Sequence, residues 1–328
     1  MKKYHVYALG NALVDMEFEV DDKFLNDNNV EKGVMTLVEE DRQHELMCQL
    51  DAFDGNKASG GSAANTIIAV AAFGGNSFYS CRVSNDDLGD FYMHDLHAAG
   101  VDSNLNSNRP EGTTGKCLVM VTDDAERTMN SFLGISATLD SGDLDKDAIR
   151  NSDYLYMEGY LVSSPTGKQA TLDARKIAQE AGVKIALTFS DPAMVQFFHD
   201  GLQEMVGDGV DLLFCNEDEA MAYTKKDTVE AAIDALKPVA KTFAVTLGSK
   251  GALLFDGKKE IHIEPNAVTA IDSNGAGDMF AGAFLYAITH GKSYEEAGKL
   301  ASLASSKVVS QFGPRLPLEE HGFLLEMV

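Results

Sequence analysis

Short apolar runs alternate with longer amphipathic segments along most of this 328-residue chain, most regularly after residue 150. The short runs predict strands, and the segments with helical spacing of apolar residues predict helices. Strands are expected at 154–157, 184–189, 212–215, 243–247, 252–255 and 260–263. Helices are expected to open at Pro165, Pro192 and Glu217 and to cover 276–290, 294–311 and 318–327. This pattern predicts an α/β fold with a doubly wound, mostly parallel sheet flanked by helices.

The first 150 residues begin in the same way but interrupt the alternation twice. Strands are expected at 4–9 and 78–83, and helices at 63–73 and 87–99. The interruptions, about 12–54 and 108–135, are polar or β-rich, and the second contains a predicted hairpin of 115–122 and 127–133 around 123–125. We expect both to meet as a small lid over the sheet edge where α/β folds bind ligands. The whole chain, 1–328, is interpreted as one domain with this lid.

Composition is that of a soluble globular protein, with 45% hydrophobic and 24% charged residues. No apolar run approaches the ~18 residues of a membrane helix, and the start of the chain is too mixed for a signal peptide. The four cysteines lack metal-type spacing and indicate a reducing compartment, so a cytoplasmic location is expected. The net charge of −24 argues against nucleic acid or an anionic membrane as a partner.

The most informative stretch runs from Asp272 to Asp278 and reads D-S-N-G-A-G-D, directly before an apolar helical run. Glycines at a helix start leave backbone N–H groups free at the positive end of the helix dipole, which suits a phosphate or a developing oxyanion. An acid inside such a site is useful where a hydroxyl must lose its proton. The stretch predicts phosphoryl transfer to an alcohol, with Asp278 as base and an anion hole formed by the amides of Gly275, Ala276 and Gly277.

Two N-terminal segments are candidates for binding hydroxyl groups. Gly60 and Gly61 precede the predicted helix at 63–73 and allow close approach to the backbone, and Asn65 can both donate and accept hydrogen bonds. Asn11 and Asp15 follow the first predicted strand, where a carboxylate can accept hydrogen bonds from two neighbouring hydroxyls. Taken alone, the glycines before the helix are more often a flexible helix cap, and a turn aspartate explains Asp15 equally well.

Two further segments follow strands in the second half of the chain. Asn216 and Glu219 form N-x-x-E in the first turn of a predicted helix, where acidic residues are favourable in any case. Thr246, Gly248 and Gly251 form T-x-G-x-x-G between two predicted strands. No P-loop pattern is present, and no G-x-G-x-x-G follows a strand, which disfavours a dinucleotide-dependent oxidoreductase.

These motifs, in this order along nearly the whole chain, resemble the ribokinase family of sugar and nucleoside kinases, the PfkB-type carbohydrate kinases. Residues 272–278 match every fixed position of the family signature D-[ST]-x-G-A-G-D. The resemblance implies a ribokinase-like fold and Asp278 as catalytic base. It also implies acceptor binding by Asn11, Asp15, Gly60, Gly61 and Asn65, and nucleotide contacts by Asn216, Thr246, Gly248 and Gly251. ATP and Mg²⁺ are the implied cofactors, with Glu219 holding the metal through water and Asp272 suggested as a K⁺ ligand.

Arg127 is one of few cations in this acidic chain and lies on the predicted lid hairpin. A surface arginine is the default interpretation. However, the stretch E-R-T at 126–128, with G-N-x-x-x-D at 10–15, resembles the adenosine kinase branch of the family, in which an arginine reaches the transferred phosphate. The resemblance implies that Arg127 stabilises transition-state charge when the lid closes.

The expected activity is therefore transfer of the γ-phosphate of ATP to a primary hydroxyl of an adenosine-like nucleoside. A kinase of a free sugar, such as ribose, fructose or a keto-sugar acid, is the alternative. A non-catalytic nucleoside- or sugar-binding relative is less favoured, because Asp278 and both glycines of the anion hole are present. The pKa of Asp278 is expected to be low at a helix N-terminus. A monomer and a homodimer are both open.

Overall fold

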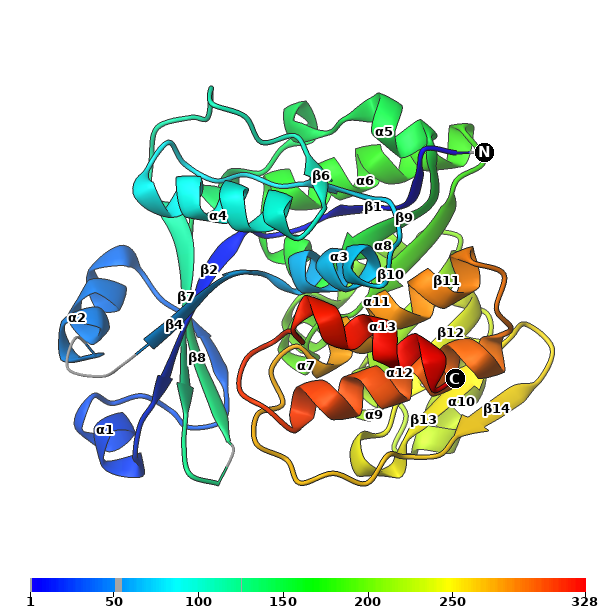
Figure 1. The fold of residues 1–328 in the computed structure, drawn as a ribbon. Helices are drawn as coiled ribbons and strands as arrows, with labels where there is room; N and C mark the ends of the chain where they lie inside the picture. Colours follow the sequence, from blue (N-terminus) through cyan, green and yellow to red (C-terminus); the bar gives the residue numbers. More distant parts are fainter. Residues whose placement is uncertain (1, 51–54, 125) are drawn as a thin grey trace.

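The computed structural model describes residues 2–50, 55–124 and 126–328, which form two β-sheets (Figure 1). The larger sheet has the strand order β14-β13-β12-β11-β10-β9-β1-β5-β6. Neighbouring strands are parallel except at one edge, where β13 and β14 are antiparallel. Its strands are β1 (Tyr4–Leu9), β5 (Ser77–Ser80), β6 (Asp102–Ser103), β9 (Ser152–Glu158), β10 (Lys184–Thr188), β11 (Val210–Asn216), β12 (Ala240–Thr246), β13 (Ala252–Phe255) and β14 (Glu260–Ile263).

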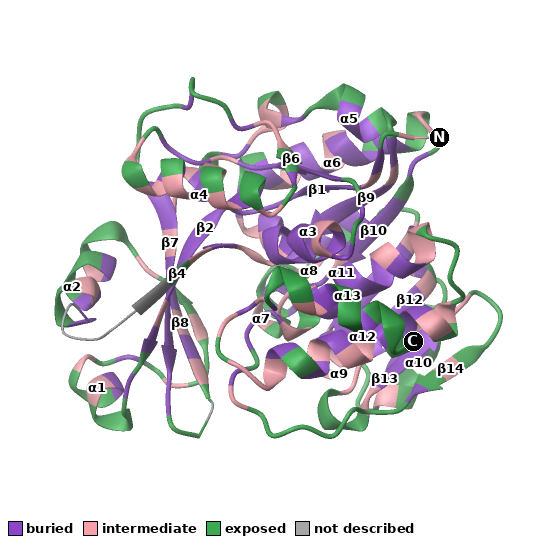
Figure 2. Ribbon diagram, viewed as in Figure 1, coloured by how far each residue is buried: buried purple, intermediate pink, exposed green. Residues whose placement is uncertain are grey.

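Helices cover both faces of the large sheet, so alternate strand residues are buried against different helices (Figure 2). Tyr156 and Phe214 belong to the core shared with α3 (Ser62–Ala72), α4 (Asp87–Ala98), α11 (Ala276–Thr289), α12 (Tyr294–Val309) and α13 (Leu318–Glu326). Their neighbours Met157 and Leu213 belong to the core shared with α5 (Lys146–Arg150), α6 (Pro165–Glu180), α7 (Pro192–Phe197), α8 (His199–Val206), α9 (Glu217–Thr224) and α10 (Val229–Leu236). The predicted α/β fold with a mostly parallel, doubly covered sheet is confirmed.

The smaller sheet projects from one side of this body and has the order β3-β8-β7-β2-β4 (Figure 1). Its strands are β2 (Leu13–Glu19), β3 (Met35–Leu37), β4 (Gly55–Gly60), β7 (Thr114–Val121) and β8 (Arg127–Gly134). The two interrupting stretches therefore do meet, because β2 pairs with β7 in parallel. The sheet reaches to residue 60 rather than 54, and whether it acts as a lid stays a prediction.

Three strands of the small sheet, β2, β3 and β4, were not predicted. The segment at β4 reads G-N-K-A-S-G, which has little strand propensity, and pairing with β2 makes it a strand. In β2, acidic and apolar residues alternate because one side of the strand packs in the hydrophobic core and the other side does not. The hairpin of β7 and β8 lies where it was predicted, although Ala125 of its turn and residues 51–54 fall outside the described part of the chain.

The two faces of the small sheet differ because successive side chains of a strand point to opposite sides. Val14, Met16 and Phe18 pack with residues of α1 (Asp22–Asp27) and α2 (Glu40–Leu50) on one side. The pairing register places the following residues on the other side, here called the inner face: Leu13, Asp15, Glu17, Met35, Leu37, Cys117, Arg127, Met129, Ser131 and Leu133.

Helices α3 and α11 begin close together. A Cβ at Gly282 of α11 would lie 2.6 Å from both the Cβ of Ala69 and the carbonyl oxygen of Thr66 on α3. Glycine at this position therefore permits the close contact that brings the first turns of both helices to one place. None of the helices in the described ranges is long and apolar enough to cross a membrane.

Candidate active site

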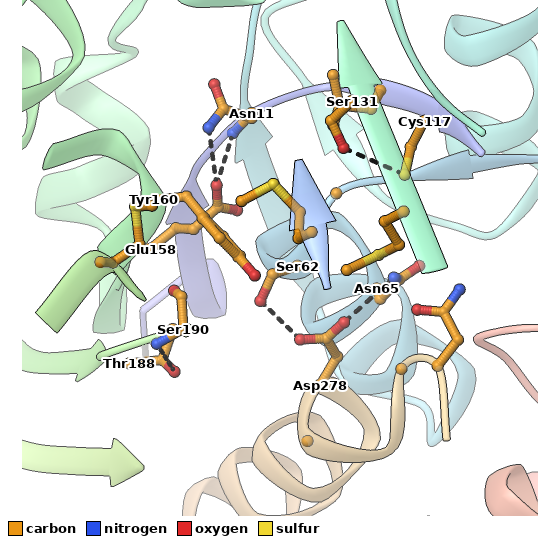
Figure 3. A pocket seen from close by; sticks show the side chains of 18 of the residues that line it. Asn11, Ser62, Asn65, Cys117, Ser131, Glu158, Tyr160, Thr188, Ser190 and Asp278 are labelled. Atoms are coloured by element: carbon orange, nitrogen blue, oxygen red, sulfur yellow. Dashed lines mark hydrogen bonds between the residues drawn. The ribbon is translucent and has the colours of Figure 1, made fainter. Parts of the chain in front are cut away.

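A cavity of about 280 Å³ lies between the inner face and the ends of strands β9 to β12, at the edge of the large sheet where ligands were expected (Figure 3). Most residues predicted from the sequence line it: Asn11, Asp15, Gly61, Asn65, Arg127, Asn216, Glu219, Thr246, Gly275, Gly277 and Asp278. Five predicted residues do not line it: Gly60, Gly248, Gly251, Asp272 and Ala276.

Asp278 lies in the first turn of α11, and two residues from the start of α3 orient its carboxylate (Figure 3). The hydroxyl of Ser62 donates a hydrogen bond to Oδ1 at 2.6 Å. The side-chain nitrogen of Asn65 donates to Oδ2 at 3.2 Å. The Oδ1 of Asn65 is buried and has no hydrogen-bond partner among the described residues, although buried polar atoms are usually paired.

Burial raises the pKa of Asp278 to about 6, although the hydrogen bonds from Ser62 and Asn65 and the charge of Arg127 act to lower it. The expectation of a low pKa at this helix N-terminus is therefore wrong, because lost hydration outweighs the stabilising contacts. The carboxylate is still mainly ionised at neutral pH. A base whose pKa lies near the working pH is well matched to accepting a proton from a hydroxyl.

The start of α11 also holds the predicted anion hole. Gly275 has a φ of 72°, and a Cβ there would lie 2.3 Å from the carbonyl oxygen of Pro314, so only glycine fits. The N–H groups of Gly275 and Gly277 have no acceptor among the described residues. The N–H of Ala276 instead donates to the carbonyl of Ser273 at 3.3 Å. In this conformation the two glycines, rather than Ala276, supply free amides beside the cavity.

Asp15 lies on the inner face and is 6% exposed. Burial, reinforced by the charge of Glu17, raises the pKa of Asp15 to about 7. Gly60 lies directly beside it, since a Cβ at Gly60 would be 2.1 Å from the Cγ of Asp15. Gly61 has a φ of 102° and approaches Asn11, whose carbonyl oxygen would be 2.1 Å from a Cβ at that position. Gly60 thus makes room for the carboxylate without lining the cavity itself.

Glu158 was not predicted as a site residue, but it is fully buried at the end of β9 and lines the cavity. One of its oxygens accepts hydrogen bonds at 3.2 Å from the backbone and side-chain nitrogens of Asn11, and the other accepts one at 2.8 Å from the N–H of Ala63 (Figure 3). It therefore joins the segment that leads into β2 to the start of α3, which follows β4. An acid directly after a predicted strand, the same signal that singled out Asp15, could have indicated it.

Apolar and sulfur-containing side chains of the inner face form the cavity wall next to Asp15. These residues are Leu13, Met35, Leu37, Cys117, Met129 and Leu133. The hydroxyl of Ser131 donates a hydrogen bond to the sulfur of Cys117 at 3.3 Å, so this hydroxyl has a partner within the wall. No single sequence motif marks the wall, because it is assembled from four strands by their register.

Arg127 lies at one end of the inner face and reaches the signature loop before α11. Its Nη1 donates to Oδ1 of Asn274 at 2.9 Å. The charge of Arg127 also helps to lower the pKa of Asp278. Asn274 occupies the variable position of the signature, so the motif predicts no role for it.

Asn216 and Glu219 form a reciprocal helix cap at the start of α9. The side chain of Asn216 accepts from the N–H of Glu219 at 2.8 Å, and the Glu219 carboxylate accepts from the backbone N–H of Asn216 at 3.1 Å. Burial raises the pKa of Glu219 to about 8, and the charges of Asp191 and Asp218 add to this effect. No cation among the described residues offsets the charge of this carboxylate, which lines the cavity, so it is the residue that would hold a divalent metal through water.

The remaining predicted residues shape loops. Gly248 and Gly251 have φ values of 56° and 89° in the turn between β12 and β13, and a Cβ at Gly251 would lie 2.0 Å from the carbonyl oxygen of Ile263. Both oxygens of buried Asp272 accept backbone hydrogen bonds, from Asn274 at 2.8 Å and from Gly313 at 3.0 Å. These contacts give Asp272 a loop-fixing role, and its suggested part in K⁺ binding stays a prediction.

Comparisons with known proteins agree with this geometry. Residues 34–321 match the model of the pfkB family carbohydrate kinases. The chain is 34% identical to the adenosine kinase of Sinorhizobium meliloti, with a TM-score of 0.93 over 99% of this chain and 100% of that one. A probable sugar kinase protein from Rhizobium etli has the same identity and TM-score, with both chains covered completely. An adenosine kinase of Schizophyllum commune is 25% identical, with 96% and 97% of the two chains covered.

The family match covers residues 34–321, which include the signature loop and most of the residues that line the cavity, whereas β1, β2 and the lining residues Asn11, Leu13 and Asp15 lie before it. The chain therefore belongs to the pfkB family of carbohydrate kinases and is a phosphotransferase that acts on an alcohol group.

Proposed function

We propose that this kinase transfers the γ-phosphate of ATP to a primary hydroxyl of a nucleoside, with an adenosine-like acceptor preferred over a free sugar. The observation that carries the proposal is the position of Asp15 next to an apolar wall on the inner face. A nucleoside combines vicinal ribose hydroxyls with a flat and largely apolar base. The carboxylate matches the first part, and the wall of leucine and methionine side chains matches the second.

A free sugar fits this wall less well. It carries hydroxyl groups on most of its carbon atoms, and each one buried against Met129 or Leu133 would lose its hydrogen bonds to water. An unpaired hydroxyl costs roughly 1–3 kcal/mol. The 34% identity to an adenosine kinase over 99% of the chain supports a nucleoside acceptor, although the equal likeness to a probable sugar kinase keeps the free sugar as the alternative.

The chemistry follows from the first turns of α3 and α11. The acceptor hydroxyl gives its proton to Asp278, whose carboxylate is oriented by Ser62 and Asn65. The hydroxyl oxygen forms a bond to the γ-phosphorus as the bond to the bridging oxygen of ADP breaks. The free amides of Gly275 and Gly277 then stabilise the charge of the transferred group, and Arg127 adds a positive charge from the small sheet.

ATP binding must overcome a net charge of −24. The N-termini of α9 and α11 and a divalent cation supply local positive charge next to the cavity. Glu219 and Asn216 would hold Mg²⁺ through its water shell, and the metal would neutralise phosphate charge during transfer. Thr246, at the end of β12, lines the same cavity and is the proposed nucleotide contact.

The test is ADP release from Mg²⁺-ATP with adenosine, inosine, guanosine, cytidine, ribose and fructose, each with and without K⁺. Turnover on adenosine with little on ribose and fructose is the expected result. Turnover only on a free sugar would overturn the acceptor assignment and keep the phosphoryl-transfer chemistry. Turnover on none of them would favour an acceptor of another class or a binding protein.

A further inference from the structure

The side chain of Asn274 contacts two residues of the small sheet through its two different ends. Its Oδ1 accepts a hydrogen bond from Nη1 of Arg127 at 2.9 Å, and its Nδ2 donates to Oε1 of Glu17 at 3.3 Å. Arg127 begins β8 and Glu17 lies on β2, so the contacts reach separate strands of the inner face. Asn274 itself is 7% exposed and belongs to the signature loop of the body.

The orientation of this amide follows from its partners. An arginine side chain only donates hydrogen bonds, and a carboxylate oxygen that receives Nδ2 must accept. Turning the amide over would place donor against donor and acceptor against acceptor. The arrangement therefore specifies a residue with one acceptor and one donor at its tip, and asparagine satisfies both.

The backbone of Asn274, which belongs to the signature loop, is also held in place. The backbone N–H of Asn274 donates to Asp272 at 2.8 Å, and the next residue is Gly275, whose left-handed backbone opens α11. The other oxygen of Asp272 accepts from Gly313 at 3.0 Å. Asn274 thus connects the small sheet directly to the loop that carries the free amides of the anion hole.

A neutral amide has a further consequence for Arg127. An ion pair with a carboxylate would hold the guanidinium in place but would also offset its charge, whereas the asparagine oxygen positions it and leaves the charge available to a phosphate. Arg127 also interacts electrostatically with Glu17, whose pKa is raised by burial, but Glu17 accepts its hydrogen bond from Nδ2 of Asn274 and not from Arg127.

We propose that Asn274 is a positioning residue that latches the small sheet onto the anion-hole loop and holds Arg127 without neutralising it. The kinetic part of this inference rests on the proposed phosphoryl transfer. The latch itself is a property of the protein without substrate, so the two can be tested separately. Opening the small sheet away from the body requires both contacts of Asn274 to break.

The latch is tested by hydrogen–deuterium exchange of the ligand-free protein. Asn274→Ala is expected to speed exchange in β2, β7 and β8 by about three- to tenfold, with little change in the large sheet. Glu17→Ala removes one contact from the other side and is expected to give a smaller change. Asn266→Ala is the matched control, since Asn266 is exposed and the one side-chain hydrogen bond that it makes within the described ranges goes to Ser302, outside the small sheet, at 3.1 Å. Unchanged exchange in both Asn274→Ala and Glu17→Ala would overturn the latch.

The role of the neutral amide is tested by steady-state kinetics of a single and a double variant. The acceptor is the one identified by the ADP-release test of the proposed function. Asn274→Ala is expected to lower kcat by about 10- to 100-fold, the range for one charge-assisted hydrogen bond. In the double variant Asn274→Asp with Glu17→Gln, both hydrogen bonds can form, because Arg127 still donates to residue 274 and the glutamine now donates where Glu17 accepted, but the arginine faces a carboxylate. Exchange protection should return while kcat stays low. Full recovery of kcat in this double variant would overturn the requirement for a neutral partner.

Discussion

The hydroxyl of Ser62 lies 2.6 Å from Oδ1 of Asp278 and donates to it, so the first residue of α3 influences the charge state of the base on α11. The contact joins two glycine-led helix starts that are 216 residues apart in the chain. Because this hydrogen bond favours the ionised carboxylate, it partly offsets the effect of burial on the pKa of Asp278.

Replacing Asp278 with asparagine should lower kcat by about 10³-fold or more and leave the KM for ATP nearly unchanged, since the proton acceptor is lost and the nucleotide contacts are kept. Steady-state kinetics with Mg²⁺-ATP provides the measurement. Asp87→Asn is the matched control, because Asp87 is also in the first turn of a helix but is exposed. Near-normal turnover of Asp278→Asn would remove this residue as the base.

Activity should decline below about pH 6, because Asp278 must be ionised to accept a proton and burial raises its pKa to about 6. Ser62→Ala removes a hydrogen bond that lowers this pKa, so the acidic limb of kcat/KM should move to higher pH. Ser305→Ala is the control, since Ser305 also contacts the first turn of α11 but donates to the carbonyl of Ala276. An acidic limb that does not move would show that another group controls it.

Asp15→Asn should raise the KM for the acceptor by about 10- to 100-fold with little change in the KM for ATP, because a carboxylate that accepts hydrogen bonds from hydroxyls is lost. Separate titrations of acceptor and ATP make the comparison. Asp123→Asn, an exposed position between β7 and β8, serves as the control in the same sheet. An effect confined to ATP would exclude Asp15 from acceptor binding.

Leu37 tests the apolar wall with little risk to folding, because it lines the cavity and is 48% exposed. Leu37→Ser should weaken nucleoside binding by about tenfold, in line with the loss of one apolar contact, and should leave any residual activity on ribose unchanged. Val34→Ser is the control, since Val34 is similarly exposed at 38% but does not line the cavity. Equal losses on nucleoside and ribose would contradict a base-binding wall.

Thermal stability should fall between about pH 5 and pH 8 in the absence of metal. Burial raises the pKa of Asp15 and Glu158 to about 7 and that of Glu219 to about 8. The native state therefore keeps protons that the unfolded chain has already released, and this stabilises the native state. The stabilisation is complete below the pKa values of the unfolded chain and is lost as the pH rises through the pKa values of the native state. Carboxyl groups with lowered pKa, such as Asp95, titrate below this window.

Calorimetric melting at constant ionic strength, with a chelator present, measures this slope. Glu219→Gln should flatten it, because glutamine does not titrate, while Glu204→Gln on the exposed surface should leave it unchanged. A melting temperature that rises steadily from pH 5 to pH 8 would contradict the assignment of these buried acids.

Local sequence was sufficient for most elements of the large sheet. Strand β1 has its predicted bounds, and α3, α4 and α11 begin or end within one residue of them. These segments are strongly periodic and are bounded by glycine, proline or capping residues, so short-range physics specifies them. The small sheet was harder to predict, because β4 becomes a strand only through its pairing with β2.

The sequence by itself determined the α/β class and the chemistry of the signature loop, since glycine conformation and the acid at a helix start are local properties. Only the tertiary structure decided which side chains of the small sheet face the cavity, because strand register brings Asp15, Cys117 and Ser131 into line. It also decided the raised pKa of Asp278, which depends on burial by distant segments, and the partners of Asn274, which lie 147 and 257 residues away. Burial and register are long-range properties, and no local motif encodes them.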